Sequence, residues 1–198
     1  MLPAITKFVR AVAVACLPTA DNVRGPFYRA GAPFRERRLC PPTEPGVPLL
    51  LSGRITESED CTPLGSAVLD VWQANRNGLY SNMLGLRFIA DSKRFHLRGR
   101  FRADSSGRYL IETVVPGHYP WPFTRARHIH FIIAHAGYVP LTTQVFFSGD
   151  QFLERDPWVK HELIISLREE PHTTSSSRYV GAFDFVLERD IRSARRAA

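Results

Sequence analysis

The sequence predicts an all-β protein, an antiparallel β-sandwich with long loops and little helix. Seven short runs are rich in β-branched and aromatic residues and are bounded by turn residues, as strands are. The 15 prolines and 13 glycines supply frequent turns, and few segments show a helical period. The predicted strands cover residues 49–56, 66–74, 96–104, 108–116, 128–136, 142–147 and 179–187.

The segment before the first predicted strand holds many of the prolines and glycines. We therefore expect residues 18–48 to form an extended, wrapping loop. The 198 residues fit one domain that can bury a substantial core. The predicted division is an N-terminal extension at 1–24 and one β-sandwich domain at 25–198.

Local signals place the remaining elements. The turn ADSSGRY at 103–109 predicts a hairpin between the runs on either side of it, with Gly107 at the positive φ that such turns require. Residues 149–163 predict a turn or two of helix, and 188–197 predict a short terminal helix. The stretch TTSSSR at 173–178 predicts a loop.

The charge balance favours anionic partners without pointing to nucleic acid. The net charge of +7 comes from 26 basic and 19 acidic residues, but the arginines are scattered and accompany no nucleic-acid-binding motif. An aromatic acid is therefore as suitable a partner as a polyanion. No apolar stretch approaches the roughly 18 residues that suggest a membrane span.

Three cysteines, Cys16, Cys40 and Cys61, show no CxxC spacing, which argues against a structural zinc site. One disulfide with a free thiol and three reduced thiols are both open from the sequence. The apolar run near the N-terminus is shorter than the roughly 7–15 residues of an export signal. We therefore expect a cytoplasmic location, with secretion left open.

Two histidines stand one residue apart at the head of the run HIHFIIAHA. Side chains at i and i+2 of a strand leave the same face, so His128 and His130 point together, whereas His135 leaves the other face. Paired imidazoles on one face suit a metal ion. An HxH pair also occurs in strands whose histidines only hydrogen-bond to backbone or solvent.

Two tyrosines follow strand ends, where functional residues collect. Tyr80 ends the turn NRNGLY, and Tyr119 follows VVPGH, nine residues before His128. A single tyrosine at such a place is usually a core or rim residue with a satisfied hydroxyl.

Five ordered motifs carry a resemblance to a known family. They are GPFY at 25–28, VLDVWQANRNGLYS at 68–81, GRYLIETVVPGHYPW at 107–121, RARHIHF at 125–131 and LTTQVFFSGD at 141–150. Together they resemble the intradiol ring-cleavage dioxygenases, and look most like the protocatechuate 3,4-dioxygenase branch. The resemblance covers most of the chain.

The resemblance implies a non-haem Fe(III) site. By motif, Tyr80 and Tyr119 would be tyrosinate ligands and His128 and His130 the imidazole ligands. A catechol, of protocatechuate, catechol or hydroxyquinol type, would displace one tyrosinate, which by motif is Tyr80, and O2 would cleave the ring between the two hydroxylated carbons to a cis,cis-muconate type product.

Two further residues match the family by motif. Arg125 matches an active-site arginine, which would stabilise negative charge developing on the ring. Gln144 matches a glutamine near substrate and iron, which would orient rather than react.

The donor chemistry supports a ferric site independently of the resemblance. Ferric iron is a hard, highly charged acid, and phenolate oxygen is a hard anionic donor. A ferrous oxygenase would combine two histidines with a carboxylate, and RHIHF has no acidic residue at short spacing.

The chain departs from the family pattern where a proline usually follows the arginine, because Ala126 and Arg127 stand there instead. Arg127 could anchor a substrate carboxylate, but a solvated arginine is the commoner case. Few residues precede GPFY, so dimerisation through the helical N-terminal region of the catechol 1,2-dioxygenase branch does not carry over, and a homo-oligomer stays open.

Two other functions compete with this hypothesis. A non-catalytic, transthyretin-like β-sandwich binding module would explain GRYLIETVVPGHY but not the HxH pair with Arg125 before it. A zinc or ferrous β-barrel enzyme would use His128 and His130 with a carboxylate elsewhere.

Overall fold

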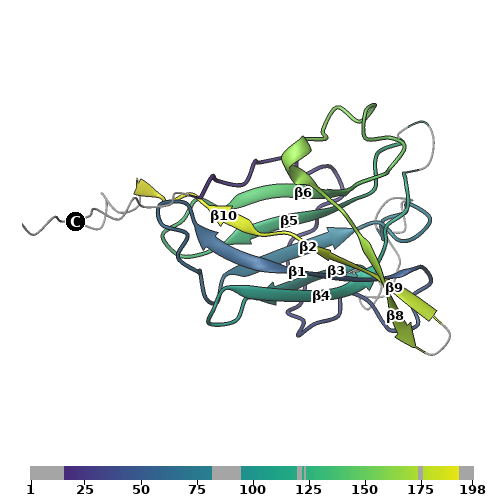
Figure 1. The fold of residues 1–198 in the computed structure, drawn as a ribbon, viewed down its shortest axis with the longest axis horizontal. Coiled ribbons are helices and arrows are strands. Elements are labelled where there is room, and N and C mark those ends of the chain that lie inside the picture. The colour runs from purple at the N-terminus through teal and green to yellow at the C-terminus, as the bar shows by residue number, and fades with distance from the viewer. Residues whose placement is uncertain (1–15, 82–94, 120–121, 123, 174–175, 192–198) are drawn as a thin grey trace, which may run out of the picture.

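A computed structural model describes residues 16–81, 95–119, 122, 124–173 and 176–191 of the chain. Ten strands form the fold within these residues (Figure 1). They are β1 (Pro48–Glu57), β2 (Val68–Gln73), β3 (Arg98–Arg102), β4 (Arg108–Val114), β5 (His128–Ala134), β6 (Leu141–Phe147), β7 (Ile164–Ile165), β8 (Arg168–Thr173), β9 (Ser176–Ala182) and β10 (Phe185–Leu187).

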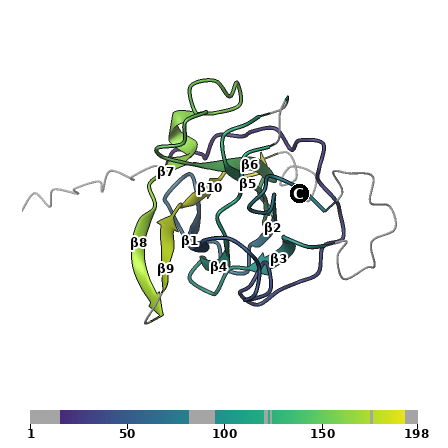
Figure 2. The ribbon, with the colours of Figure 1, turned by 90° about the vertical axis from the view of Figure 1, so that its right-hand side faces the viewer.

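The strands form two sheets that face each other (Figure 2). In one sheet, β1 pairs with β4, β9 and β10, and β8 pairs with β9; in the other, the order is β3-β2-β5-β6-β7. Most pairs are antiparallel, but β9 and β10 run parallel to β1, and β7 runs parallel to β6. The predicted β-sandwich is confirmed, with two mixed sheets.

The main core lies between the two sheets. Leu51 of β1 and Phe131 of β5 are fully buried there, together with Val71 of β2. Each buried side chain of this size stabilises the fold by roughly 1.5–3 kcal/mol. Alternation along β2 and β5 directs these apolar side chains inward and the intervening ones to the outer face of the sheet.

Six of the seven predicted strands are confirmed in place. The last run, 179–187, is instead divided between β9 and β10. The division occurs at Phe183, whose N–H donates to the Ser52 carbonyl at 2.9 Å and whose own carbonyl crosses over Gly53. A Cβ on Gly53 would lie 1.8 Å from that carbonyl oxygen, so the crossing depends on the missing side chain. The short β7 and the hairpin strand β8 were not predicted.

The predicted hairpin at 103–109 is wrong. The turn is tight, with the N–H of Gly107 donating to the Asp104 carbonyl at 3.0 Å, and Gly107 has the expected positive φ of 74°. However, β3 pairs with β2, and β4 pairs with β1. The turn therefore carries the chain from one sheet to the other, since burial between the sheets outweighed local pairing.

The predicted wrapping segment runs along the edges of both sheets. The N–H of Arg35 donates to the Arg100 carbonyl of β3 at 2.8 Å, and the N–H of Leu39 donates to the Glu112 carbonyl of β4 at 2.9 Å. This pairing covers two strand edges that would otherwise offer unpaired backbone groups.

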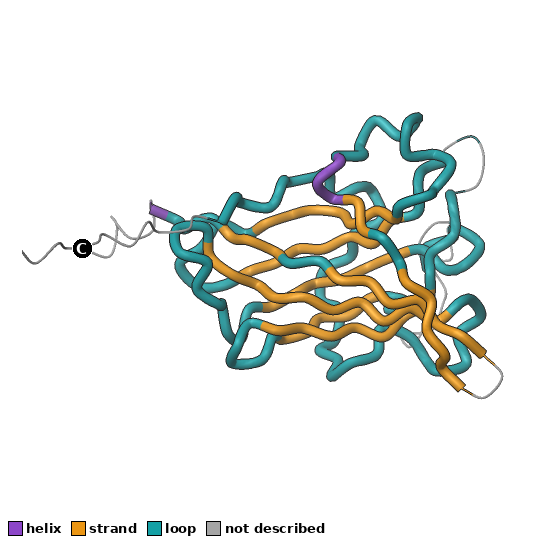
Figure 3. The backbone as a smooth tube through the Cα atoms, viewed as in Figure 1, coloured by secondary structure: helices purple, strands orange, loops and turns teal. Residues whose placement is uncertain are grey.

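Helix is scarce in the described residues, as Figure 3 shows. The turn predicted within 149–163 is confirmed as a 3-10 helix, η1 (His161–Leu163). The predicted terminal helix at 188–197 lies largely outside the described residues. The predicted loop at 173–178 contains the start of β9, and its residues 174–175 lie outside the described residues.

A disulfide joins Cys16 to Cys61, and Cys40 is a buried free thiol whose pKa burial raises to about 11. Of the two cysteine states left open by the sequence, the structure contains one disulfide with a free thiol. The bond closes a loop with a sequence separation of 45 residues and ties the N-terminal segment to the β1–β2 connection.

Reduction of this disulfide is expected to lower stability by roughly 2–4 kcal/mol, since the open chain gains conformational freedom when unfolded. Urea unfolding with and without a thiol reductant measures the effect. In a Cys61→Ser variant, the reductant should change nothing further. Equal midpoints of the wild-type protein in both conditions would contradict the expectation.

Candidate metal centre

The outer face of the second sheet carries a row of four polar or aromatic side chains. Register pairs Arg98 of β3 with Trp72 of β2, Trp72 with His130 of β5, and His130 with Gln144 of β6. Directly opposed residues of antiparallel strands project to the same face. All four are buried, although this face points away from the core between the sheets.

The N-terminal segment covers this row. The Val23 carbonyl accepts a hydrogen bond from Nε2 of Gln144 at 2.7 Å. A Cβ on Gly25 would lie 3.4 Å from Cε1 of His130, so the backbone passes directly over the imidazole. Phe27 stacks on Tyr80 with 4.7 Å between ring centroids. The site is thus closed from solvent by residues that precede the sandwich.

Two histidines are fixed on β5 as the strand parity predicts. Nδ1 of His128 lies 2.6 Å from the Ala126 carbonyl, which can only accept, so Nδ1 donates and Nε2 keeps its lone pair. Nε2 of His128 lies 3.1 Å from Nε2 of His130. Trp72 stacks on His130 at 4.7 Å and 4° between ring planes, which holds the second imidazole in place. His135 lies elsewhere, with Nε2 3.2 Å from the Gly65 carbonyl.

The two tyrosines come from loops that touch through their backbones. Gly78, at a φ of 77°, lies so close to the neighbouring loop that a Cβ would be 1.7 Å from the His118 carbonyl oxygen. The N–H of Gly117 donates to the Asn75 carbonyl at 2.9 Å. This contact brings the Tyr80 and Tyr119 hydroxyls to 2.7 Å from each other.

The four donor atoms meet at one buried point. Oη of Tyr119 lies 2.7 Å from Oη of Tyr80 and 3.0 Å from Nε2 of His128, which in turn lies beside Nε2 of His130. The structure therefore brings together all four predicted ligands from three separate segments. Two phenol oxygens and two imidazole nitrogens that converge this closely are residues that could hold a cation.

Burial keeps all four groups neutral. Desolvation, and next the charge of Arg125, lowers the pKa of His128 to about 3, and desolvation holds the pKa of His130 well below its usual value. Desolvation raises the pKa of Tyr119 to about 12 and that of Tyr80 well above its usual value. A multivalent cation among them would favour both phenolates, because its charge repays the cost of burying theirs.

Arg125 and Gln144 lie together beside this point, as predicted. A terminal nitrogen of Arg125 donates to Oε1 of Gln144 at 3.1 Å. The guanidinium carbon lies 6.0 Å from the centroid of the Tyr119 ring. Asp156 holds the same guanidinium through two hydrogen bonds of 2.9 and 3.1 Å, and its side chain is fully buried. Arg125 is therefore a fixed positive charge at the edge of the site.

Sequence reasoning missed Arg98. Its guanidinium carbon lies 5.5 Å from the centroid of the Tyr80 ring, and Nε donates to the Ser81 hydroxyl at 3.3 Å. Burial lowers its pKa to about 10, so it remains charged at neutral pH. Arg98 alternates with Arg100 and Arg102 along one strand, and the sequence alone does not show which of the three is buried.

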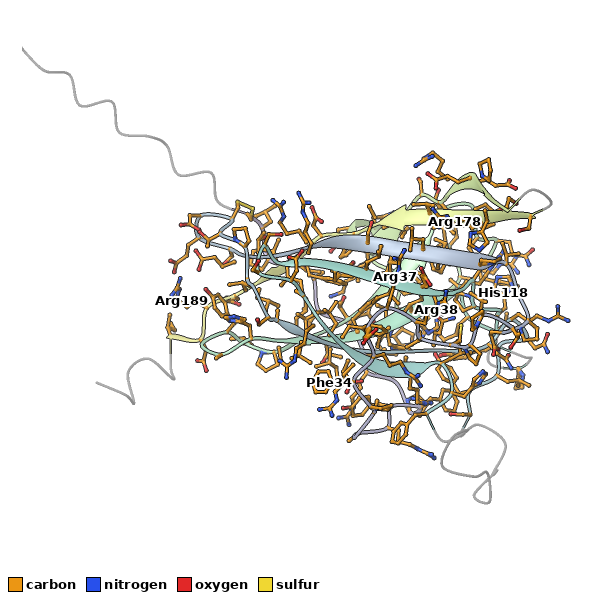
Figure 4. The ribbon with its side chains drawn as sticks, turned by 90° about the horizontal axis from the view of Figure 1, so that it is seen from below. Phe34, Arg37, Arg38, His118, Arg178 and Arg189 are labelled. Carbon is orange, nitrogen blue, oxygen red and sulfur yellow. A yellow bond between two sulfur atoms is a disulfide. The ribbon has the colours of Figure 1, made fainter. Side chains whose placement is uncertain are left out.

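Arg127 and His118 have a defined partner. Both donate to Asp150, whose side chain is almost fully buried, and Figure 4 shows His118 at the end of the sandwich opposite Arg189. The Arg127 side chain is 40% exposed, so the solvated arginine of the sequence hypothesis is also ion-paired.

Comparison with known proteins identifies the family. A family model described as "Dioxygenase" matches residues 23–189, which is most of the chain. The chain belongs to the intradiol ring-cleavage dioxygenase family. This membership, with the convergence of four donors, favours an enzyme over a transthyretin-like binding module.

Two curated relatives show the level of similarity. Catechol 1,2-dioxygenase 2 of Acinetobacter lwoffii is 36% identical over 155 residues, covering 70% of this chain and 54% of the relative. Chlorocatechol 1,2-dioxygenase of Pseudomonas putida is 31% identical over 198 residues, covering 91% of this chain and 72% of the relative. The chain thus spans about half the length of the first, and these relatives do not place it in the protocatechuate branch.

A solved structure of similar size also matches. The dioxygenase domain of a dioxygenase and carbohydrate-binding protein fusion from Streptomyces sp. SirexAA-E has a TM-score of 0.71 and 34% identity, covering 87% of this chain and 99% of that one. The dioxygenase family assignment therefore rests on both sequence and fold.

In the described part of the chain, no group of three or more His, Cys, Asp and Glu side chains could hold a metal ion together. No helix in the same residues is long and apolar enough to cross a membrane.

Proposed function

We propose that the chain is a non-haem Fe(III) dioxygenase that cleaves the ring of a catechol with O2 between the two hydroxylated carbons. The observation that carries this proposal is the convergence of the hydroxyls of Tyr80 and Tyr119 with Nε2 of His128 and His130. Family membership supplies the reaction type.

The donor set fits ferric iron. Two phenolates are hard anionic ligands that stabilise Fe(III) over Fe(II), and two neutral imidazoles complete the set. Ferric iron, when bound, supplies a Lewis acid that activates the catechol toward O2. The tautomer of His128 is already the one that a metal ligand needs, because Nδ1 donates to the Ala126 carbonyl.

Arg125 and Gln144 act on the substrate side of the site. The Arg125 guanidinium is held by Asp156 and therefore costs no reorganisation when negative charge develops on the ring. Gln144 is fixed between Arg125 and the Val23 carbonyl, so it can orient an oxygen atom but has no group to exchange a proton at neutral pH. The N-terminal segment covers Gln144 and His130 and so excludes water from this side of the site.

By the resemblance, one of the two phenols would give up its place to the bound substrate, and its Oη would be the natural acceptor for a catechol proton. Tyr80, assigned this part by motif, is the more enclosed phenol: it stacks on Phe27 and lies under Arg98. Separate Tyr80→Phe and Tyr119→Phe variants decide the assignment. The variant that lacks the departing phenol should bind catechol without releasing a coordinated tyrosinate, as followed by visible absorption.

Catechols are the proposed substrate class, and a comparison of differently substituted catechols identifies which of them the protein cleaves. Oxygen uptake with catechol, protocatechuate, hydroxyquinol and a chlorocatechol, followed by mass analysis under labelled O2, should give a ring-opened diacid containing both oxygen atoms for at least one of them. Iron-loaded protein that consumes no O2 with any of the four would contradict the substrate class while leaving the metal site standing.

The disulfide bears on the location of the protein. Disulfides persist in oxidising compartments and are rare in the cytosol. The Cys16–Cys61 bond therefore favours an oxidising compartment over the cytoplasmic location expected from the N-terminal pattern. Thiol labelling tests this in protein isolated under native conditions and then unfolded without a reductant: labelling of all three cysteines would support the cytoplasm, and labelling of Cys40 alone would support an oxidising compartment.

A further inference from the structure

Two buried carboxylates, Asp150 and Asp156, lie six residues apart in the loop that follows β6. Their side chains are 1% and 0% exposed. Both face the short segment 125–127 that leads into His128, although the motifs assigned neither a role. A buried carboxylate must be paired to be tolerated, so what each one pairs with is informative.

Asp150 joins two loops through one oxygen atom. Its Oδ2 accepts hydrogen bonds from Nε2 of His118 at 2.8 Å, from the backbone N–H of Arg127 at 3.0 Å and from Nε of Arg127 at 3.1 Å. Its Oδ1 accepts from the backbone N–H of Phe152 at 2.9 Å. Burial alone would raise the pKa of Asp150, but these donors outweigh it and hold the pKa below its usual value.

The residues that donate to Oδ2 of Asp150 stand next to two of the proposed iron ligands. His118 immediately precedes Tyr119, and Arg127 immediately precedes His128. A single carboxylate oxygen therefore fixes the loop that carries Tyr119 relative to the start of β5, which carries His128. In this arrangement Oη of Tyr119 lies 3.0 Å from Nε2 of His128.

Asp156 binds Arg125 and Ala126 of the same segment. It forms two hydrogen bonds with the Arg125 guanidinium and accepts the backbone N–H of Ala126 at 3.1 Å. Its contacts thus set the direction of the Arg125 guanidinium, which lies 6.0 Å from the centroid of the Tyr119 ring. Asp156 does not contact His128 directly. The two are linked through the backbone of Ala126, whose N–H donates to Asp156 and whose carbonyl accepts from Nδ1 of His128.

We propose that Asp150 and Asp156 are positioning residues with separate tasks: Asp150 aligns Tyr119 with His128, and Asp156 aims Arg125 at the substrate. The inference rests on the proposed function for what is positioned. Asparagine keeps the shape of either side chain but turns one acceptor oxygen into an NH₂ group. In Asp150→Asn, the NH₂ group would face N–H donors or leave them unpaired.

The test compares Asp150→Asn with Asp156→Asn in the iron-loaded protein. Asp150→Asn should shift the tyrosinate-to-iron absorption and weaken iron binding by about 10–100-fold, the loss in metal affinity typical when a residue that supports the ligands of a metal site is replaced, with faster iron release to a chelator. Asp156→Asn should leave the absorption and the iron release near wild type. It should lower kcat with catechol by about 10–100-fold, with a smaller change in KM.

A purely structural role predicts a different result, in which both variants lower the thermal midpoint and leave absorption, iron release and kcat unchanged. That result overturns the proposal. If Asp150→Asn fails to fold, His118→Asn and Arg127→Gln each remove one of the two side-chain contacts to Asp150 from a partly exposed donor. Each should shift the absorption, and unchanged spectra in both would also overturn the proposal.

A metal-free readout separates this inference from the proposed function. In crystals of metal-free Asp150→Asn protein, the distance between Oη of Tyr119 and Nε2 of His128 should exceed the wild-type distance, while the contact between Arg125 and Gln144 stays. An unchanged distance contradicts the positioning role of Asp150 even if the protein binds no iron. A wild-type protein that binds no iron contradicts the proposed function alone.

Discussion

Replacement of Tyr119 by phenylalanine is expected to remove most of the catalytic turnover and to change the visible absorption of the iron-loaded protein. Tyr119 holds the central position among the donors, since its hydroxyl lies within hydrogen-bond distance of both Tyr80 and His128. Loss of one anionic ligand removes several kcal/mol of charge stabilisation, which corresponds to a fall in kcat/KM on the order of 10³-fold.

The matched control is Tyr109→Phe. Tyr109 is also a buried tyrosine, but its hydroxyl donates to the Phe183 carbonyl at 2.7 Å, in the region between the two sheets. This control should lower the free energy of unfolding but leave the visible absorption and the turnover unchanged. Full turnover and an unchanged spectrum in Tyr119→Phe would remove this tyrosine from the metal site and favour a carboxylate-assisted zinc or ferrous site.

The substitution Gly78→Ala is expected to cost roughly 2–4 kcal/mol and to separate the two phenols. Gly78 needs its positive φ, and a Cβ there would lie 1.7 Å from the His118 carbonyl oxygen, which is backbone and has little room to move. The strain of the backbone conformation and the forced displacement of the neighbouring loop add together. Urea unfolding and iron affinity measure the two consequences.

Gly137→Ala is the control that isolates the contact. Gly137 has a φ of 83°, close to that of Gly78, but a Cβ added to it meets no atom within 4 Å. Its substitution should cost only the backbone strain, roughly 1–2 kcal/mol. Equal losses of stability in the two variants, with iron affinity retained in Gly78→Ala, would show that the two tyrosine loops do not depend on this close approach.

Much of the site could be predicted because its signals are local. The alternation of a strand decides that His128 and His130 share a face, and this parity is confirmed by the 3.1 Å between their Nε2 atoms. Tyr80 and Tyr119 each follow a strand end, and the order of the motifs supplied their relation to the histidines. The roles of these residues as iron ligands remain predictions.

Other features depend on contacts between segments distant in sequence. The tight turn at 103–107 has the local signature of a hairpin, yet its flanking strands joined different sheets because their apolar faces are buried against each other. The break between β9 and β10 depends on Gly53, 130 residues away from Phe183. Asp150 is the last residue of the motif at 141–150 and Asp156 lies outside the motifs; the resemblance gave neither a role, and only their burial beside 125–127 reveals one.

The most direct test of the central claim is the visible absorption of purified metal-free protein during titration with ferric iron. If both tyrosines and both histidines share one metal ion, a tyrosinate-to-iron band should grow and saturate at one equivalent of iron for each chain, and it should be altered in the Tyr80→Phe and Tyr119→Phe variants. A protein that stays colourless, or a band that both variants leave unchanged, would contradict the account.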